Sequence, residues 1–565
     1  MRGCLSHTRT EAAASNNMGD DKLKLVPLIQ SPQIVSVLTS NVETPGTRLP
    51  SCPVPGTIQC GVGMSSQRDI FDLERLPPAL DAFLRDTNPW WEGKPGPLLP
   101  PYRRWAFQTT LKKLHSGLAP VTVLRGPRQV GKTTLQLQLI EHLLKEKGVA
   151  PSRILRVQFD EIPSLRGLSE PVLSIARWFE NRILGRTFNE AAREGQTAYL
   201  FLDEAQNLAD WAPQLKALVD HHTLRVLVTG SSALRIEGGR DSLAGRIATV
   251  DLGTLLLREI AGLRSGHHLP PCLPENGLEA LLRQEFWQEL HAWGRAQREI
   301  RDQAFAQFSE RGGYPTAQAR WDVPWPEVAD QLNETVIQRA IQHDLRVGER
   351  GSKRDAQLLE EVYRLACRYA GQSPGQAIFI HQIRQALRGN IGWQRILKYL
   401  QFLDRSMLLK LVPPLELRLK RRKGNHKLCI CDHSLRASWL QEVIPLDPEA
   451  LDQAPHLQDL AGHLAESVSG YYLSGIPHLD LAHFPERGAE PEVDFVLTVG
   501  EQRIPLEVKY RRHIDSHRDT LGLRAFLEKT VYNARFGVLV TMQDDVALPD
   551  PRIVCLSLPS LLLLR

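Results

Sequence analysis

The sequence lacks several features that would assign it to a specialised class of protein. Its eight cysteines are scattered and include no C-x-x-C pair, which indicates neither a structural zinc site nor a disulfide framework and favours a reducing compartment. No stretch approaches the roughly 18 consecutive apolar residues that a membrane helix needs. The first residues have no continuous apolar core of the kind a signal peptide requires. We therefore expect a cytoplasmic protein with no membrane segment.

The sequence also lacks a strong charge of either sign. Its 69 Lys and Arg residues against 64 Asp and Glu residues give a net charge of +5 over 565 residues, so any basic partner surface must be local. Hydrophobic residues at 42% and charged residues at 24% are near the average for globular proteins. The length allows about three or four domains.

Aromatic residues are absent from the first part of the chain. Residues 1–64 contain no Phe, Tyr or Trp and are rich in Ser, Thr, Pro and Gly. Such a segment buries too little apolar area to offset the entropy of ordering it, so we predict a disordered tail over 1–64. Met18 and Met64 leave open the alternative of a later start of translation.

Apolar β-type runs then alternate with helical segments. Strands are predicted at 121–124, 154–159, 198–202 and 225–228, and helices at 132–147, 171–184 and 211–221. Continuous apolar strands joined through helices are typical of a parallel sheet that is covered on both faces. We predict an α/β domain over 65–260, followed by a Gly-, Pro- and His-rich loop at 262–277.

A glycine-rich segment follows the first of these strands and precedes a helix. It fits G-x-x-x-x-G-K-S/T at every fixed position. In such a loop the backbone N–H groups converge on phosphate oxygens, the lysine reaches the β- and γ-phosphates, and the hydroxyl of Thr133 binds Mg²⁺. The predicted nucleotide-binding residues are Gly126, Pro127, Arg128, Gln129, Val130, Gly131, Lys132, Thr133 and Thr134.

The strand at 198–202 ends in two acids. Asp203 is placed to contact Mg²⁺ and Glu204 to polarise the attacking water, so Glu204 and Lys132 are the predicted catalytic residues. Ser231, after the next strand, is predicted to sense the γ-phosphate or to position water, although a plain turn explains it equally well. Arg246 either acts as an arginine finger toward a neighbouring nucleotide or pairs with a structural acid.

Three segments carry a family resemblance. GPRQVGKTT, LFLDEAQN and VTGSSALRIEGGRDSLAGR, in this order, resemble the bacterial and archaeal AAA-type P-loop ATPases, in which a C-terminal domain of unknown function follows the ATPase. The resemblance extends over about residues 85–565 and includes the residues Gly-Gly-Tyr-Pro at 312–315. It implies an AAA+-like core that uses ATP and Mg²⁺, and it implies no substrate.

The middle of the chain, 278–450, is expected to be mostly helical. It ends in an amphipathic helix that runs into a strand, 394–411, and a basic hairpin around 423–425, which is a winged-helix-like pattern. Basic groups on such a hairpin could neutralise phosphates of a polyanion, or they could form a solvated charged face. The basic residues are Arg418, Lys420, Arg421, Arg422, Lys423 and Lys427.

The last region, 455–565, carries acids on neighbouring β-type runs. Asp494 lies on one run, and Glu507 and Lys509 lie on the next, where residues i and i+2 share a face. Glu466 precedes them on a helix predicted at 457–473, and a further helix is predicted at 524–534. This order of elements resembles the PD-(D/E)xK nuclease superfamily and its restriction-endonuclease-like α/β fold.

The second resemblance implies roles for these residues. Asp494 and Glu507 would bind Mg²⁺, Glu466 would assist as a further metal ligand, and Lys509 would orient the attacking hydroxide or stabilise developing charge. Inactive members of such folds bind nucleic acid without cutting it, and a solvated E-x-K motif on an edge strand is a common alternative.

The sequence therefore predicts an ATP-hydrolysing enzyme whose nucleotide state controls engagement of DNA by the last region, with metal-dependent cleavage as one form of that engagement. The alternative is a nucleotide-dependent interaction switch whose last region binds a partner without cleavage. A kinase is less favoured, because the Asp203–Glu204 pair suits activation of water. Oligomer formation stays open.

Overall fold

The computed structural model describes most of the chain from residue 76 to residue 565. The residues outside the description are 1–75, 161–164, 166–167, 209, 231–242, 274–276, 345–354, 418–419, 422–423, 487 and 489. The tail predicted at 1–64 therefore lies outside the described residues.

The first half of the described chain forms a five-stranded parallel sheet, as the alternation of strands and helices predicts. The strand order is β2-β3-β4-β1-β5, and every neighbouring pair is parallel. The carboxyl ends of parallel strands share one edge of the sheet, so the segments after β1, β3 and β4 come together there. The strands are β1 Val121–Arg125, β2 Ile154–Gln158, β3 Ala198–Asp203, β4 Leu224–Gly230 and β5 Ile247–Asp251.

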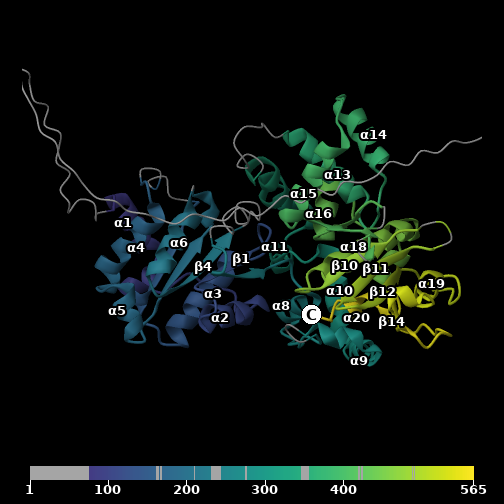
Figure 1. Cartoon of the computed structure of the whole chain (residues 1–565), viewed down its shortest axis with the longest axis horizontal. Helices are drawn as coiled ribbons and strands as arrows, with labels where there is room; N and C mark the ends of the chain where they lie inside the picture. Colours follow the sequence, from purple (N-terminus) through teal and green to yellow (C-terminus); the bar gives the residue numbers. More distant parts are fainter. Residues whose placement is uncertain are drawn as a thin grey trace, which may run out of the picture. The chain divides into compact units, whose positions relative to one another are not determined.

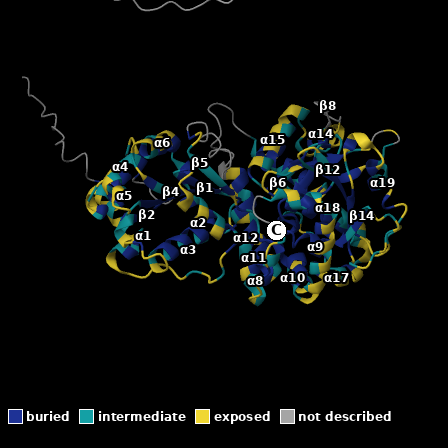
Figure 2. Cartoon of the chain, turned by 60° about the horizontal axis from the view of Figure 1, so that its bottom comes forward, coloured by how far each residue is buried: buried dark blue, intermediate teal, exposed yellow. Residues whose placement is uncertain are grey.

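Consecutive residues of the strands face two different hydrophobic cores. Leu124, Phe201 and Leu227 join the core that contains side chains of α2 and α3, whereas their neighbours Val123, Leu200 and Val228 join the core of α4 and α6. Figure 1 shows α2 and α3 on one side of β1 and β4, and α4 and α6 on the other. Figure 2 shows the outer sides of these helices as the exposed ones.

Two of the three helices predicted around this sheet, 132–147 and 211–221, begin and end close to the predicted bounds as α3 and α6, whereas α1, α2 and α5 were not predicted. The helix predicted at 171–184 is α-helical only to Phe179 and continues as a wider π-type turn over Glu180–Leu184. The helices are α1 Pro78–Thr87, α2 Ala106–Ser116, α3 Lys132–Lys145, α4 Pro171–Phe179, α5 Phe188–Arg193 and α6 Trp211–His221.

Strand β5 was not predicted from the sequence. It lies at the edge of the sheet beside β1, and only one of its five residues is buried. An edge strand therefore showed too weak an apolar pattern to be recognised. Helix α8, Leu257–Ser265, also overruns the predicted end of the domain near residue 260, so the predicted loop begins only after Ser265.

The middle of the chain is mainly helical. Helices α13 to α15 lead into an antiparallel pair of short strands, β6 Leu409–Val412 and β9 Lys427–Ile430, with the two-residue strands β7 Glu416–Leu417 and β8 Lys420–Arg421 between them. The helices are α9 Gln284–Ala296, α10 Arg298–Arg311, α11 Pro315–Ala319, α12 Trp325–Leu332, α13 Ala356–Arg368, α14 Gln376–Leu387, α15 Trp393–Arg405 and α16 His433–Leu440.

The last part contains a second five-stranded sheet, in the order β10-β11-β12-β13-β14. Its first three strands are antiparallel, and β12, β13 and β14 are parallel to one another. The strands are β10 Asp480–Phe484, β11 Val493–Val499, β12 Gln502–Lys509, β13 Gly537–Thr541 and β14 Ile553–Ser557. The helices are α17 Pro448–Asp452, α18 Gln458–Ser474, α19 Leu521–Leu527 and α20 Leu558–Leu561.

One helix of this part differs from the prediction. The helix predicted at 524–534 is the shorter α19, Leu521–Leu527, followed by a single 3-10 turn at Thr530–Tyr532. Asn533, which has a φ of 48°, ends that turn in a left-handed conformation. A continuous helix over 524–534 is therefore wrong.

Two hydrogen bonds join the start and the end of the region after the first sheet. Arg258 Nε on α8 donates to the carbonyl oxygen of Arg565 at 2.7 Å, 307 positions further along the chain. The backbone N–H of Leu273 donates to the carbonyl oxygen of Leu564 at 2.8 Å. Helix α8 thus directly follows the first sheet in the sequence, yet it is hydrogen-bonded to the last residue of the chain.

Candidate functional site

The loop between β1 and α3 has a backbone that its glycines make possible. Gly131, directly before α3, has a φ of 89°. A Cβ atom on Gly126 would lie 2.1 Å from the carbonyl oxygen of Leu252, so only glycine fits there. The two fixed glycines of the motif are thus explained by a positive φ and by a close approach of backbone.

Lys132 lies against this loop. Its Nζ donates to the carbonyl oxygens of Gly126 at 3.0 Å and Pro127 at 2.8 Å, and the residue is only 6% exposed. The ammonium group of the first residue of α3 is therefore held inside the turn of the loop.

Asp203, at the end of β3, is the centre of a buried polar network. Thr133 Oγ1 donates to its Oδ2 at 3.1 Å, and Arg156 Nη2 on β2 donates to the same oxygen at 3.2 Å. Thr229 Oγ1, on the neighbouring strand β4, donates to its Oδ1. Thr133 and Asp203, 70 positions apart in the chain, are thus brought into direct contact.

Glu204 follows Asp203 in a left-handed conformation, with a φ of 53°. Its backbone N–H donates to Thr229 Oγ1 at 3.3 Å, and its carboxylate accepts a hydrogen bond from Gln206 Nε2. Thr229 therefore contacts both acids of the pair. Sequence reasoning missed Thr229, although its place at the end of the strand beside β3 was the signal that could have identified it.

The other two predicted residues near the nucleotide have different outcomes. Ser231 lies outside the described residues. Arg246 forms an ion pair with Asp220 of the same chain, with Nη2 3.0 Å from Oδ2, which is the second of the two alternatives for this residue. Action of Arg246 toward a neighbouring nucleotide stays a prediction.

A buried ion pair that the sequence did not indicate contacts the glycine-rich loop between β1 and α3. Arg104 and Glu259 are 8% and 0% exposed, and two hydrogen bonds of 3.1 and 2.7 Å join them. Arg104 Nη1 also donates to the carbonyl oxygens of Val130 at 2.8 Å and Gly253 at 3.0 Å. One guanidinium therefore connects the glycine-rich loop at 126–134, which we call the phosphate-type loop, to the segment that precedes α8.

The Gly-Gly-Tyr-Pro segment at 312–315 is bonded on two sides. Gly313 accepts from the N–H of Leu255 at 2.6 Å and donates to Asp432 Oδ2 at 2.7 Å. Thr316 Oγ1, just beyond it, donates to Gln129 Oε1 of the loop at 3.3 Å. The segment thus lies between the loop of the first sheet and the start of α16.

The predicted acids of the last region are brought together on β11 and β12. The N–H of Val508 donates to Asp494 Oδ2 at 2.9 Å, and the N–H of Asp494 donates to Glu507 Oε2 at 3.3 Å. Lys509 Nζ lies 2.5 Å from Glu507 Oε1, so the two residues of the E-x-K motif share a face as predicted. We call Glu466, Glu492, Asp494, Glu507, Lys427 and Lys509 the carboxylate cluster.

Lys427 is the unexpected member of this cluster. Its side chain is 2% exposed, and its Nζ lies 2.5 Å from Asp494 Oδ1 and 2.8 Å from Glu466 Oε2. Phosphate neutralisation on an open hairpin and a solvated charged face, the two alternatives for the hairpin residues, are therefore both wrong for Lys427. The side chains of the other hairpin residues, Arg418, Lys420, Arg421, Arg422 and Lys423, lie outside the description.

Charge and burial set the protonation of the cluster. Burial raises the pKa of Glu507 to about 8, and the Asp494 carboxylate acts in the same direction. Burial opposes ionisation of Asp494, but Lys427 and Lys509 hold its pKa below the ordinary value. Burial likewise opposes a charge on Lys427, whose pKa the carboxylates of Asp494 and Glu466 nevertheless raise well above the ordinary value.

The basic residues after the E-x-K motif are paired with acids. Arg511 bonds to Asp519, and Arg512 Nε lies 2.6 Å from Asp452 Oδ1. Burial raises the pKa of Tyr510 well above its ordinary value, and its hydroxyl donates to a backbone carbonyl. The charges of both arginines that follow β12 are therefore paired within the same region of the chain.

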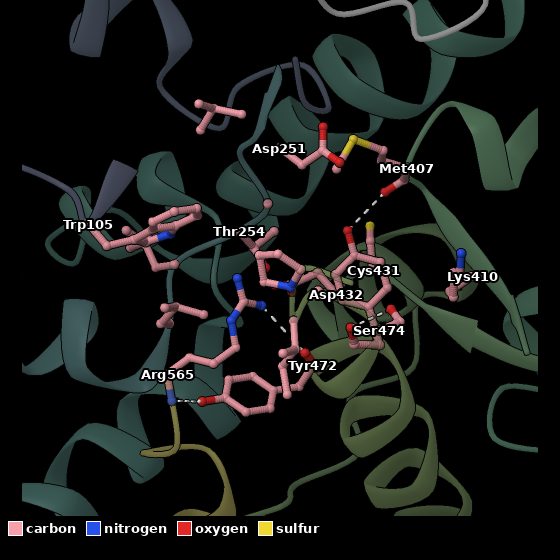
Figure 3. Close-up of a pocket in the computed structure, with 18 of the residues that line it drawn as sticks. Trp105, Asp251, Thr254, Met407, Lys410, Cys431, Asp432, Tyr472, Ser474 and Arg565 are labelled. Carbon is pink, nitrogen blue, oxygen red and sulfur yellow. Dashed lines mark hydrogen bonds between the residues drawn. The ribbon is translucent and has the colours of Figure 1, made fainter. Parts of the chain in front are cut away.

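A cavity of about 790 Å³ lies apart from both sites. Figure 3 shows it between Trp105, Asp251 and Thr254 on one side and Met407, Lys410 and Tyr472 on the other. Its charged groups are largely paired, because Arg125 binds Asp251 at 2.5 Å and Lys410 lies 3.9 Å from Asp404. The cavity contains none of the residues singled out from the sequence, since its lining comes from segments far apart in the chain.

The part of the chain that the structure describes contains neither a group of metal-binding side chains nor a helix able to cross a membrane. No three side chains of His, Cys, Asp or Glu in that part of the chain are grouped so that they could hold a metal ion. In the same part, no helix combines the length and the apolar composition that crossing a membrane requires.

Comparison with known proteins identifies two regions. Residues 302–444 match the model of a domain of unknown function, a match that includes Lys427 and ends before the acids of the carboxylate cluster. Uncharacterized proteins of Mycobacterium tuberculosis and Mycobacterium bovis are each 32% identical over 179 residues, 30% of this chain and 34% of theirs. An uncharacterized protein of Haemophilus influenzae is 23% identical over 327 residues, 56% of this chain and 68% of that protein.

The match thus spans about a third of the length of the mycobacterial relatives. The other region is the one that contains the glycine-rich loop and Asp203. Residues 119–261 match the model of an AAA domain, and this match supports an AAA-type P-loop ATPase domain with a nucleotide-binding function in the first half of the chain.

Proposed function

We propose that the first sheet and its loop bind ATP with Mg²⁺ and hydrolyse it. The observation that carries the proposal is the 3.1 Å contact between Thr133 Oγ1 and Asp203 Oδ2. A hydroxyl and a carboxylate that close together supply oxygen ligands for one Mg²⁺ ion, which usually takes only one or two protein ligands besides phosphate and water. The residues present therefore fit the ion, which would neutralise charge on the phosphate oxygens when bound.

Each residue of the site then has a role. The backbone of 126–134 and the ammonium of Lys132 bind the phosphates, and Thr133 with Asp203 holds the ion. Glu204 accepts the proton of the attacking water. Arg156 and Thr229 orient the Asp203 carboxylate through the hydrogen bonds that they donate.

The test is ATP hydrolysis by wild type, Lys132→Ala, Glu204→Gln and the control Lys147→Ala, which changes an exposed lysine just after α3. We expect no turnover with Lys132→Ala and unchanged turnover with Lys147→Ala. Glu204→Gln should still bind ATP but turn over about 100-fold more slowly, as loss of a general base predicts. Undiminished hydrolysis by Lys132→Ala would remove the assignment of the loop.

We further propose that the last region engages nucleic acid under control of the nucleotide state. The helix α18, the antiparallel strands with Asp494 and Glu507, and the parallel strand β13 support a PD-(D/E)xK-like arrangement. In this form Asp494, Glu507 and Glu466 would hold Mg²⁺ only after Lys427 has left Asp494 and Glu466, and Lys509 would stabilise developing charge. Wild type and Lys509→Ala incubated with supercoiled, linear and branched DNA, with Mg²⁺ or Mn²⁺ and with or without ATP, test it by cleavage.

A second candidate has a specific observation in its favour. Lys427 lies within 2.8 Å of both Asp494 and Glu466, where it neutralises the acids that cleavage would need for metal. In this version the chain is a nucleotide-dependent switch, and its last region binds a partner without cutting it. DNA-stimulated ATP hydrolysis that persists in Asp494→Ala and Lys509→Ala, with no nicking by wild type, would favour it.

A further inference from the structure

The position of Lys427 distinguishes the carboxylate cluster from an open metal site. Its ammonium bridges Asp494 Oδ1 at 2.5 Å and Glu466 Oε2 at 2.8 Å, and Glu492 Oε1 is 3.9 Å away. The ring centroid of Phe495 lies 5.0 Å from Nζ. The side chain is 2% exposed, so water contributes little to its solvation. A buried ammonium is stable only when acids surround it in this way.

The remaining oxygens of Asp494 and Glu507 also accept hydrogen bonds. Asp494 Oδ2 accepts from the N–H of Val508, and the two oxygens of Glu507 accept from Lys509 and from the N–H of Asp494. Together with the absence of a three-ligand group among the described residues, this arrangement does not fit a bound Mg²⁺. A Mg²⁺ ion, which the nuclease-like resemblance implies, would have to occupy the position of the Lys427 ammonium between Asp494 and Glu466.

We propose that the ammonium of Lys427 is the resident cation of the carboxylate cluster and competes with divalent metal ions for Asp494 and Glu466. A lysine and a divalent cation require the same oxygens, so the cluster holds one or the other. The competition between Lys427 and metal follows from the contacts of the cluster alone. Only its consequence for the binding of nucleic acid rests on the proposed function of the last region. The contacts that carry the proposal involve neither ATP nor DNA.

The lysine and the acids come from different parts of the chain. Lys427 is the first residue of β9, within the region that matches the domain of unknown function, whereas Glu466 and Asp494 lie on α18 and β11 beyond it. Strand β9 pairs with β6 and packs on α18. A displacement of the β6–β9 pair is therefore the movement that would open the cluster to metal.

The test measures Mn²⁺ binding by full-length protein without nucleotide or nucleic acid, from the electron paramagnetic resonance signal of free Mn²⁺. The variants are Lys427→Gln, Lys427→Arg and the double variant Lys427→Gln, Asp494→Asn. Glutamine removes the charge but can still donate to one carboxylate, and arginine keeps the charge. The double variant lacks a carboxylate of the cluster but keeps the phosphate-type loop, so it distinguishes Mn²⁺ bound at the cluster from Mn²⁺ bound weakly at the loop.

We expect Lys427→Gln to bind one additional equivalent of Mn²⁺. Its affinity for Mn²⁺ at the cluster should be at least about tenfold higher than that of the wild type. Lys427→Arg should not gain it, and the double variant should lose it. Equal Mn²⁺ binding by wild type and a folded Lys427→Gln would overturn the proposal.

A second comparison does not depend on folding of any Lys427 variant. Asp494→Asn in the otherwise wild-type chain should leave Mn²⁺ binding unchanged, because Lys427 already excludes the metal. A micromolar Mn²⁺ site in wild type that Asp494→Asn abolishes would also overturn the proposal. Neither outcome depends on ATP hydrolysis or DNA binding, so failure of the proposed function is a separate result.

Discussion

The guanidinium of Arg104 is bound by both carboxylate oxygens of Glu259, at 3.1 and 2.7 Å, and donates at the same time to the carbonyl oxygen of Val130 in the phosphate-type loop. Glu259 also accepts from the N–H groups of Trp105 and Leu256, at 2.9 and 3.0 Å. Burial opposes ionisation of Glu259, but Arg104 holds its pKa below the ordinary value. The pair therefore ties the loop to the start of α8.

Removal of one partner should be costly, because the other charge stays buried. We expect Arg104→Gln to lower the free energy of unfolding by about 3 kcal/mol, measured by urea denaturation. The control is Arg85→Gln, which breaks an exposed pair in which Arg85 Nε lies 3.0 Å from Asp81 and the side chains are 40% and 35% exposed. That change should cost less than about 1 kcal/mol. Equal losses would contradict a special role for Arg104.

Thr229 gives a prediction about turnover. Thr229→Val removes the hydroxyl that donates to Asp203 and accepts from the N–H of Glu204, so both acids lose an orienting contact. We expect ATP turnover to fall about tenfold, because the loss of these two hydrogen bonds should cost about 1–2 kcal/mol.

The matched control for Thr229 lies in the neighbouring strand. The hydroxyl of Thr122 is buried and has no hydrogen-bond partner among the described residues. Thr122→Val should therefore leave turnover unchanged. If both substitutions lowered turnover alike, a general disturbance of the sheet would explain the effect better than contact with the acids.

The sequence was sufficient for features that depend on local pattern. The loop at 126–134, the acids at the end of β3 and the shared face of Glu507 and Lys509 follow from spacing along one or two neighbouring elements. The parallel sheet also follows from continuous apolar strands joined through helices, whereas the strand order β2-β3-β4-β1-β5 depends on pairing between distant segments and was not predictable.

Features that depend on distant contacts were not predictable. A lysine in a basic hairpin gives no sign that it will be buried, because its burial depends on Glu466 and Asp494 from other elements. The same holds for Arg104, whose partner Glu259 is 155 positions away. Strand β10 was missed for a related reason, since it is a short edge strand paired only with β11 in the sheet.

His483 provides a prediction of pH dependence. Burial lowers the pKa of its imidazole to about 4, although a hydrogen bond between Nε2 and the carbonyl oxygen of Asn425, at 2.8 Å, acts in the opposite direction. In the unfolded chain His483 is protonated as the pH falls below about 6.5, whereas in the folded chain it is protonated only below about pH 4. Stability should therefore fall as the pH drops from 6.5 toward 4, by up to about 3 kcal/mol from this residue.

The measurement is urea denaturation at several pH values between 4 and 7 for wild type, His483→Gln and the exposed control His456→Gln. Glutamine keeps a donor at the position of Nε2 but does not titrate. We expect a shallower loss of stability toward low pH in His483→Gln, and no change of slope in the control. Identical slopes for all three proteins would show that His483 is not held neutral.

Gly371, in the turn after α13, donates its N–H to the carbonyl oxygen of Leu428 on β9 at 2.7 Å and tests the packing of this turn against α18. Its φ is 82°, and a Cβ atom there would lie 1.9 Å from the carbonyl oxygen of His463. Gly371→Ala should lower the free energy of unfolding by more than about 1 kcal/mol, measured by thermal or urea denaturation. Gly462→Ala is the control within α18, where no atom lies within 4 Å of the added carbon. It should stabilise the helix by about 0.5–1 kcal/mol, and a loss of stability in both variants would refute the steric argument.

The hydrogen bond from Arg258 to the carbonyl oxygen of Arg565 has a consequence for the time course of synthesis. The two residues are 307 positions apart, and Leu273 bonds in the same way to Leu564. During translation, domains generally fold in order as they leave the ribosome, at about 5–20 residues per second. Helix α8 ends the region that matches the AAA domain, yet it reaches its final contacts only after residue 565 has been made. The contacts that tie the phosphate-type loop to α8 through Arg104 and Glu259 lie within residues 104–259, so they can form before α8 is joined to the end of the chain.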